Sequence, residues 1–240
     1  MWLVAEYEAS ALFTLKPATA TASGGKTLLV PTPFAIKMAL LDAACRLEGQ
    51  AVAAGAWAWL GGLTVALRPA LVVVVNNTFT KVLKPRRGEA RPGSKHAGYF
   101  QQTINYREYA YLAGPFAIAL QLSADADAER LARWLAHVNY LGKRGSFIQL
   151  QGVPEILDDL PPDFIVVDGR LPGFVLGAVL TQLDDVGEGL SFARANIYSR
   201  KRKEEIKLGK HRVLRHVALP YRLVASSRGY SLYELVGETP

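Results

Sequence analysis

The chain has 240 residues, of which half are hydrophobic and a fifth are charged, and its formal net charge is +7 at pH 7. This length can bury a substantial core in one domain or in two small ones, and the composition excludes an intrinsically disordered chain. The single cysteine, Cys45, excludes a disulfide within the chain and a zinc site built on its own cysteines.

Residues 2–48 predict a strand followed by a helix. The segment 2–15 has the aromatic and β-leaning residues of an extended strand. Pro31-Thr32-Pro33 is typical of a helix start, because Thr32 can cap the first turn and a proline fits the first helical position. Apolar residues then continue the helix to about Glu48.

The next stretch allows two readings. Residues 49–67 carry no charge over roughly the length that crosses a bilayer, so a membrane-associated protein using residues 49–75 is one hypothesis. The glycine pair at 61–62 and the following Arg68-Pro69 favour instead the end of a helix, a turn and a buried strand. Four consecutive valines, 72–75, indicate a strand that is buried on both faces.

The remaining pattern completes an α+β fold. Strand patterns recur at 100–110, 116–122 and 146–151, and the clearest helix spans 123–142 with Ser123 or Asp125 as its expected cap. Residues 1–152 therefore predict a ferredoxin-like (RRM-like) βαββαβ domain with an insertion at about 76–105 between its second and third strands. Residues 153–240 predict a smaller, mostly β domain, with strands at about 164–168, 174–181, 190–198, 211–219, 221–226 and 230–236.

Positive charge gathers in two stretches. Residues 81–107 carry seven lysines and arginines against one acid, and residues 196–216 carry eight against two. Aromatic residues accompany both stretches, among them Phe79, Tyr99, Tyr106 and Tyr198. Cations that bind phosphates beside rings that stack on bases are the means by which proteins hold single-stranded nucleic acid. Solvated surface charge is the alternative interpretation.

Two loops have a possible role in phosphate binding or catalysis. SGGKT at 23–27 is like part of a nucleotide-binding P-loop, but Ala20 stands where that pattern needs a glycine, so nucleotide hydrolysis is not expected. The same loop could bind an RNA phosphate, with Lys26 and Lys37 nearby. His96, next to Lys95, could act in metal-independent RNA cleavage, and simple phosphate contact is the favoured alternative.

Four motifs in the first 150 residues resemble the CRISPR-associated RAMP superfamily, most closely the type I Cascade subunit that caps the 5′ handle of the guide RNA. Pro31-Thr32-Pro33-Phe34-Ala35-Ile36-Lys37 resembles its proline-led first helix, with Phe34 in place of the usual small residue. The other three are, in order, the start of a basic thumb, the strand returning from it and the turn after the second helix: Lys84-Pro85-Arg86-Arg87, Tyr106-Arg107-Glu108-Tyr109, and Tyr140-Leu141-Gly142-Lys143-Arg144-Gly145-Ser146.

The N-terminal residues do not have the pattern of a secretory signal, and glycines interrupt the apolar stretch at 49–67, so a cytoplasmic protein is expected. The resemblance implies a non-catalytic RNA-binding subunit, for which no cofactor or metal is expected. Its expected partners are the guide RNA 5′ handle, the backbone RAMP subunit and the large subunit, with target DNA left open for the basic run at 200–203. A metal-independent endoribonuclease that processes precursor guide RNA is the alternative. The expected RNA-binding residues are Lys26, Lys37, Lys84, Arg86, Arg87, Arg91, Lys95, His96, Tyr106, Arg107, Lys143, Arg144, Arg200, Lys201 and Arg202.

Overall fold

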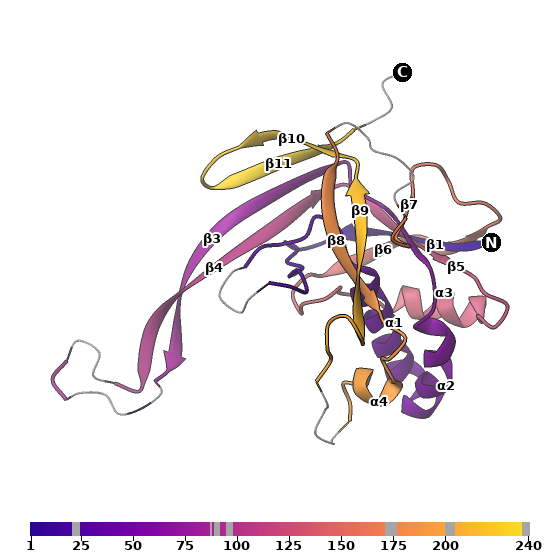
Figure 1. Cartoon of the computed structure of the whole chain (residues 1–240), viewed down its shortest axis with the longest axis horizontal. Coiled ribbons are helices and arrows are strands. Elements are labelled where there is room, and N and C mark those ends of the chain that lie inside the picture. Colours follow the sequence, from indigo (N-terminus) through magenta and orange to yellow (C-terminus); the bar gives the residue numbers. More distant parts are fainter. Residues whose placement is uncertain are drawn as a thin grey trace.

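The computed structural model describes residues 1–20, 25–86, 88, 92–94, 98–170, 177–199 and 205–236 (Figure 1). Its strands form a five-stranded sheet, a four-stranded sheet and a two-stranded ribbon. The helices lie together on one side of the strands, and a long hairpin extends away from them. The α+β class expected from the sequence is confirmed.

The five-stranded sheet contains the predicted ferredoxin-like unit. Its order is β6 (Ile148–Leu157), β1 (Trp2–Ala9), β5 (Phe116–Gln121), β2 (Val65–Arg68) and β7 (Ile165–Val166), and all neighbours are antiparallel. With β7 set aside, the order in space is the fourth, first, third and second strand of a βαββαβ unit, which is the split βαβ arrangement.

Three helices cover one face of this sheet. They are α1 (Pro33–Glu48), α2 (Gln50–Leu60) and α3 (Ala128–Ala136). Thr32 caps α1 as predicted, because its hydroxyl accepts a hydrogen bond from the Ala35 amide at 3.2 Å. The cap of α3 is instead Asp127, whose carboxylate accepts from the Arg130 amide at 3.0 Å, so the expectation of Ser123 or Asp125 was wrong.

The core lies between the helices and the sheet. Tyr7 on β1 is fully buried, and its hydroxyl donates to the Leu135 carbonyl of α3 at 2.8 Å. Burial raises the pKa of Tyr7 above its usual range. Within the described residues, no helix is long and apolar enough to cross a membrane. Residues 49–67 form α2, a turn and β2, as the second of the two readings predicted.

The four-stranded sheet carries the long hairpin. Its order is β10 (Tyr221–Ser226), β11 (Tyr230–Leu235), β3 (Val72–Pro85) and β4 (Phe100–Ala113). The valine run opens β3, and burial alternates along it: Val73 and Val75 are buried, whereas Val72 and Val74 are half-buried. The expectation of burial on both faces was therefore wrong. We call the projecting part of β3 and β4, residues 76–86 and 98–107, the arm.

The ribbon pairs β8 (Val179–Val186) with β9 (Arg212–Leu219) and packs on α1. The residues between its two strands include a short helix, α4 (Phe192–Ala195), where a strand at 190–198 was expected. The regular structure after residue 152 is almost all strand, as expected, and three of its strands extend the sheets of the first half. β7 pairs with β2, and β11 pairs with β3.

Candidate nucleic-acid interface

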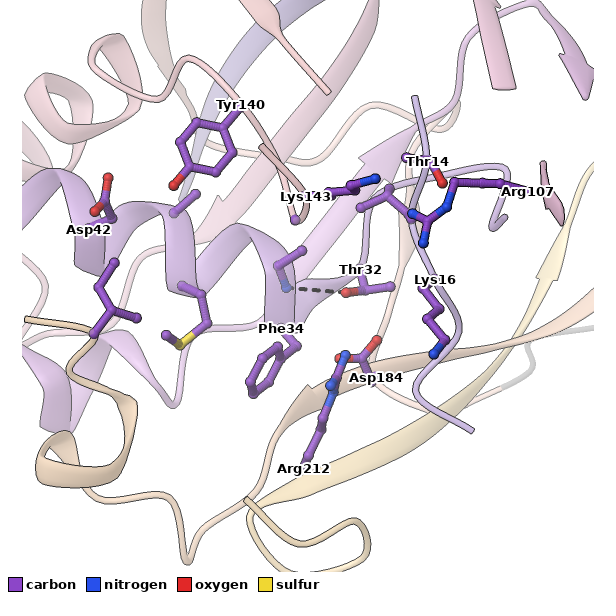
Figure 2. Close-up of a pocket in the computed structure, with 16 residues that line it drawn as sticks. Thr14, Lys16, Thr32, Phe34, Asp42, Arg107, Tyr140, Lys143, Asp184 and Arg212 are labelled. Carbon is purple, nitrogen blue, oxygen red and sulfur yellow. Dashed lines mark hydrogen bonds and ion pairs between the residues drawn. The ribbon is translucent and has the colours of Figure 1, made fainter. Parts of the chain in front are cut away.

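A pocket of about 520 Å³ lies at the base of the arm, between α1, the segment 14–16 and the ribbon (Figure 2). Its positively charged residues come from four separate parts of the chain. Lys16 follows the first strand, Arg107 lies on β4, Lys143 lies in the turn after α3, and Arg212 begins β9. The other lining residues are Thr14, Leu15, Thr32, Phe34, Ala35, Met38, Ala39, Asp42, Tyr140, Gly142, Asp184 and Ile197.

Local contacts with β4 bring Lys16 beside Arg107. The amide of Phe13 donates to the Ala110 carbonyl at 2.7 Å, and the Ala110 amide donates back to Phe13 at 2.7 Å. Further along the same edge, the Glu108 amide donates to the Gly25 carbonyl at 2.6 Å. A side chain at position 25 would collide with the β4 backbone, so the close approach requires glycine.

The turn at 140–146 fixes Lys143 on the same side of the pocket. Gly142 has a φ of 70°, in the left-handed region, and a side chain there would meet Leu15. The Thr14 amide donates to the hydroxyl of the buried Ser146 at 3.2 Å. Figure 2 shows Lys143, Arg107 and Lys16 near Thr14, with Asp42 toward the other end of the pocket.

These three cations lack neutralising acids among the described residues. Burial and the charge of Arg107 lower the pKa of Lys143, so the two cations destabilise one another. The Nε of Arg107 is buried and has no hydrogen-bond partner in the described part of the chain. A buried, unpaired guanidinium nitrogen is costly, and an anion in the pocket would remove that cost.

Both acids of the pocket already have partners, Asp184 within the pocket and Asp42 beside it. Asp184 accepts from Arg212 Nε at 2.5 Å, and the Arg212 guanidinium lies 4.3 Å from the centre of the Phe34 ring. Asp42 accepts from Arg46 at 2.8 Å and from the Tyr198 hydroxyl at 2.5 Å. The pocket therefore combines an apolar middle, at Phe34 and its neighbours, with a cationic end that favours a phosphate.

The arm carries four of the predicted residues, and Arg107 is the one at its base. Lys84 is exposed near its tip, and the Arg86 amide donates to the Tyr99 carbonyl at 2.9 Å, which closes the end of the hairpin. Tyr106 packs its ring 4.9 Å from that of Phe79 and donates its hydroxyl to Asn77 Oδ1 at 2.9 Å. By strand alternation, Lys84 is on the same face of the hairpin as Arg107, and Tyr106 is on the other.

The structure thus brings Arg107 and Lys143 together, and it keeps two other predicted residues close to them. Arg144 is exposed directly after Lys143. Lys26 lies at the base of the arm, where its ammonium is 3.7 Å from Glu108 and its side chain is 79% exposed. Seven predicted residues lie outside the described residues: Arg87, Arg91, Lys95, His96, Arg200, Lys201 and Arg202.

Lys37 was predicted to bind RNA, and its buried position contradicts that prediction. Its side chain is 2% exposed, and its ammonium donates to Asp185 Oδ1 at 2.6 Å and to the Gly61 carbonyl at 3.0 Å. Burial lowers the pKa of Lys37, and the charge of Asp185 acts against that shift. The residue therefore ties α1 to the ribbon and is not accessible to RNA.

Sequence reasoning missed Lys16 and Arg212 as pocket residues. Lys16 is a single cation in a loop, and no spacing relates it to Arg107. Arg212 was counted in the second basic stretch, but nothing in the sequence indicated that it would contact Phe34 from β9. The departure of Phe34 from the family pattern was the one visible signal, because a ring at that position adds an apolar surface to the pocket.

The face of the five-stranded sheet opposite the helices is covered by other residues of the same chain. Phe164 packs on Ala66, Ala117 and Ala119, and the Arg68 guanidinium lies over the Phe164 ring at 5.6 Å. Arg68 also pairs with Glu6 and, at 3.7 Å, with Asp163. An RRM-like sheet that binds RNA needs open rings on this face. The candidate interface is therefore the pocket and the arm, and not the sheet.

No protein-family model matches the chain, and the search of curated proteins found no match. Among solved structures, a chain of a CRISPR RNA-guided surveillance complex is 16% identical, with 91% of this chain and 90% of that one covered and a TM-score of 0.49. A CRISPR protein from Archaeoglobus fulgidus is 14% identical, with 99% and 92% covered and a TM-score of 0.38. At these scores and identities, neither likeness indicates what this chain binds.

Proposed function

We propose that this chain is an RNA-binding, non-catalytic subunit of a type I Cascade-like CRISPR effector complex, in which it caps the 5′ handle of the guide RNA. The cationic end of the pocket is the observation that carries the proposal. Lys16, Arg107 and Lys143 share one site without a neutralising acid among the described residues. A phosphate is the anion that a basic chain with aromatic neighbours most readily binds.

The position of two resembling motifs supports the same proposal. Arg107 belongs to the motif at 106–109 and Lys143 to the motif at 140–146, and these motifs are separated by β5 and α3 in the chain. In the structure, both residues line one pocket. The turn at Gly142 and the edge contacts of β4 each hold one of the cations in place, so the two motifs serve a single site.

The arm supports the proposed protein partners. Four large apolar side chains share its Tyr106 face by strand alternation, and each is more than half exposed: Phe79, Leu83, Phe100 and Ile104. Exposed apolar side chains that lie together on one face, as these do, usually belong to an interaction site. We assign this face to a neighbouring backbone or large subunit, with the guide RNA at the base of the arm.

A salt titration tests the proposal. The purified chain is titrated with a labelled single-stranded RNA, and the association constant is measured from low to moderate salt. Three phosphate contacts predict a slope of about −2 for log association constant against log salt, since each contact contributes about −0.7 on single strands. A binding constant that stays flat with salt, or the absence of binding, would overturn the proposal.

The endoribonuclease alternative depends on His96, which lies outside the described residues. It is separated from the proposal by incubating the chain with a repeat hairpin RNA in EDTA. Intact RNA that is retarded on a native gel supports the binding role. A site-specific cut that disappears in His96→Ala would replace the proposal with the alternative.

A further inference from the structure

Glu108 is a buried acid next to the cationic end of the pocket. It follows Arg107 directly on β4, so its side chain is on the opposite face of the strand and does not line the pocket. The residue is 7% exposed. A buried carboxylate is costly unless it is bound, and a negative charge beside a phosphate site repels the phosphate. By its charge alone, Glu108 would weaken the proposed RNA site.

The hydrogen bonds of Glu108 indicate a different role. Its Oε2 accepts from the Thr27 amide at 2.9 Å, and its own amide donates to the Gly25 carbonyl at 2.6 Å. The Lys26 ammonium, 3.7 Å from Oε1, is a weaker partner, because that side chain is 79% exposed. Glu108 therefore binds the backbone of the segment 25–28 and fixes it against β4.

The segment 25–28 in turn holds the backbone that carries Lys16. The Thr27 hydroxyl accepts from the Leu15 amide at 3.0 Å, and the Leu28 amide donates to the Leu15 carbonyl at 2.8 Å. Both backbone polar groups of Leu15 are thus bound to this segment. Leu15 is buried, whereas Lys16, the next residue, is exposed and lines the pocket.

These contacts link the two cations through a short path. Arg107 precedes Glu108 on β4, and the hydrogen bonds that begin at the Glu108 carboxylate end one residue before Lys16. The strand β4 is also held by its ladder with β3, and Phe13 pairs with Ala110. Loss of the Glu108 carboxylate would therefore release the backbone next to Lys16 and leave Arg107 in place.

We propose that Glu108 is a positioning residue for the RNA site, because through Thr27 and Leu15 it holds Lys16 beside Arg107, where both can contact one phosphate. The inference rests on the proposed RNA-binding function, and it adds a residue outside the pocket on which the pocket depends. A cation that is held in place before the ligand arrives loses less conformational entropy on binding.

Substitutions at Glu108 test the proposal by the sign of their effect on binding of a labelled single-stranded RNA. Glu108→Ala should weaken binding about tenfold and make the salt slope about 0.7 less negative, as loss of the Lys16 contact would. Glu108→Gln should bind as well as the wild type, because its amide oxygen can still accept from Thr27. Glu155→Ala, which removes an exposed acid on β6, is the matched control and should show no loss.

Charge alone predicts the opposite result, since every variant that removes an acid would then bind RNA more tightly. Glu108→Ala binding as tightly as the wild type, or more tightly, would overturn the inference. So would Glu108→Gln and Glu108→Ala losing affinity equally, because the hydrogen bond to Thr27 would then not be the cause.

A double-mutant cycle tests whether Glu108 acts through Lys16. In the Lys16→Ala background, Glu108→Ala should cost less than about twofold, because the contact that it supports is already absent. A full loss in that background would contradict the proposed path. If thermal midpoints show that Glu108→Ala does not fold, Thr27→Val replaces it, since it removes the hydroxyl that binds the Leu15 amide. Thr27→Val should reproduce the loss, and Thr27→Ser should not.

The outcomes separate this inference from the function on which it rests. If the wild type binds RNA without salt dependence, or not at all, the proposed function fails and Glu108 has no site to position. If the wild type binds with salt dependence and Lys16→Ala weakens binding, the proposed function stands. Glu108→Ala or Thr27→Val binding like the wild type would then overturn only the positioning role.

Discussion

Arg107 and Lys143 lie close enough for their positive charges to repel one another when the pocket holds no anion. The lowered pKa of Lys143, due to burial and the Arg107 charge, shows this cost. A bound phosphate would pair with both. We therefore expect Lys143→Ala to weaken RNA binding about tenfold, as the loss of one charged hydrogen bond does. It should also make the salt slope about 0.7 less negative.

The matched control for Lys143→Ala is Arg222→Ala, which removes an exposed cation on β10 that does not line the pocket. It should leave both the affinity and the slope nearly unchanged. Equal losses in the two variants would mean that net charge, and not the pocket, determines binding.

Lys37 and Asp185 form the buried ion pair between α1 and the ribbon. Removal of Lys37 leaves the buried Asp185 with Arg215 Nε, 3.7 Å away, as its remaining ion-pair partner. Loss of the closer, buried partner costs about 3 kcal/mol in the free energy of unfolding. We expect Lys37→Met to lose about that much in urea unfolding. The double variant Lys37→Met/Asp185→Leu should recover most of the loss, because it removes both buried charges and the Arg215 side chain, which is 39% exposed, keeps its contact with solvent. A single variant as stable as the wild type would contradict the assignment.

The role of Lys37 could not be predicted from its neighbours in sequence. Two adjacent aspartates, such as Asp184 and Asp185, are typical of a solvated loop, but here they are buried on β8 and accept hydrogen bonds from Arg212 and Lys37. A lysine bound to RNA and a lysine bound to a distant carboxylate look alike in a linear pattern. Arg107 and Lys143 were predictable as binding residues because each belongs to a local motif. That the two residues would line the same pocket was not predictable from the sequence.

At the scale of elements, Glu48 joins the end of α1 to α3. Its carboxylate accepts from the Trp134 indole at 2.9 Å and pairs with Arg133 and, at 3.2 Å, with Arg130. Burial alone would raise the pKa of Glu48, but the hydrogen bonds from Arg133 and Trp134 and the two positive charges lower it below its ordinary value. The ionised form therefore stabilises the folded state.

This lowered pKa fixes the sign of a pH dependence. The stabilisation by Glu48 is present above its unfolded pKa, and it is lost as the pH falls through the folded one. We expect Glu48→Gln to lower the free energy of unfolding by about 1–3 kcal/mol at pH 7. Denaturant unfolding should show this difference shrinking as the pH falls below about 4. A difference that is constant across that range would show that charge is not the cause.

The element order was predictable, but the sheet membership of its strands was not. Hydrophobic periodicity placed the strands and helices of residues 2–151 well enough to give the βαββαβ order. The buried strand predicted before Arg68 and the strand predicted at the valine run adjoin in sequence, but they belong to different sheets: β2 lies in the five-stranded sheet and β3 in the four-stranded sheet. Periodicity reports which face is buried and carries no information on which strand lies beside it.

At the scale of the whole molecule, strands from residues after 152 complete the sheets begun before it. β11 covers the edge of β3 at Val72–Asn76, and the Tyr221 hydroxyl donates to the Ala70 carbonyl at 2.5 Å. We expect the full chain to unfold in one cooperative transition, and a fragment ending at residue 152 to aggregate because it exposes these edges. A soluble fragment with its own sharp thermal transition would instead establish an independent domain.

The strand β4 runs without a break from the arm to the core. Ile104 lies on the arm's exposed apolar face, and Arg107, three residues later, reaches the pocket. The ladder with β3 keeps the strand stiff between them. A neighbouring subunit that binds and rotates the arm would therefore also move the Arg107 guanidinium at its base. Binding of that subunit and the affinity of the pocket for nucleic acid would then change together.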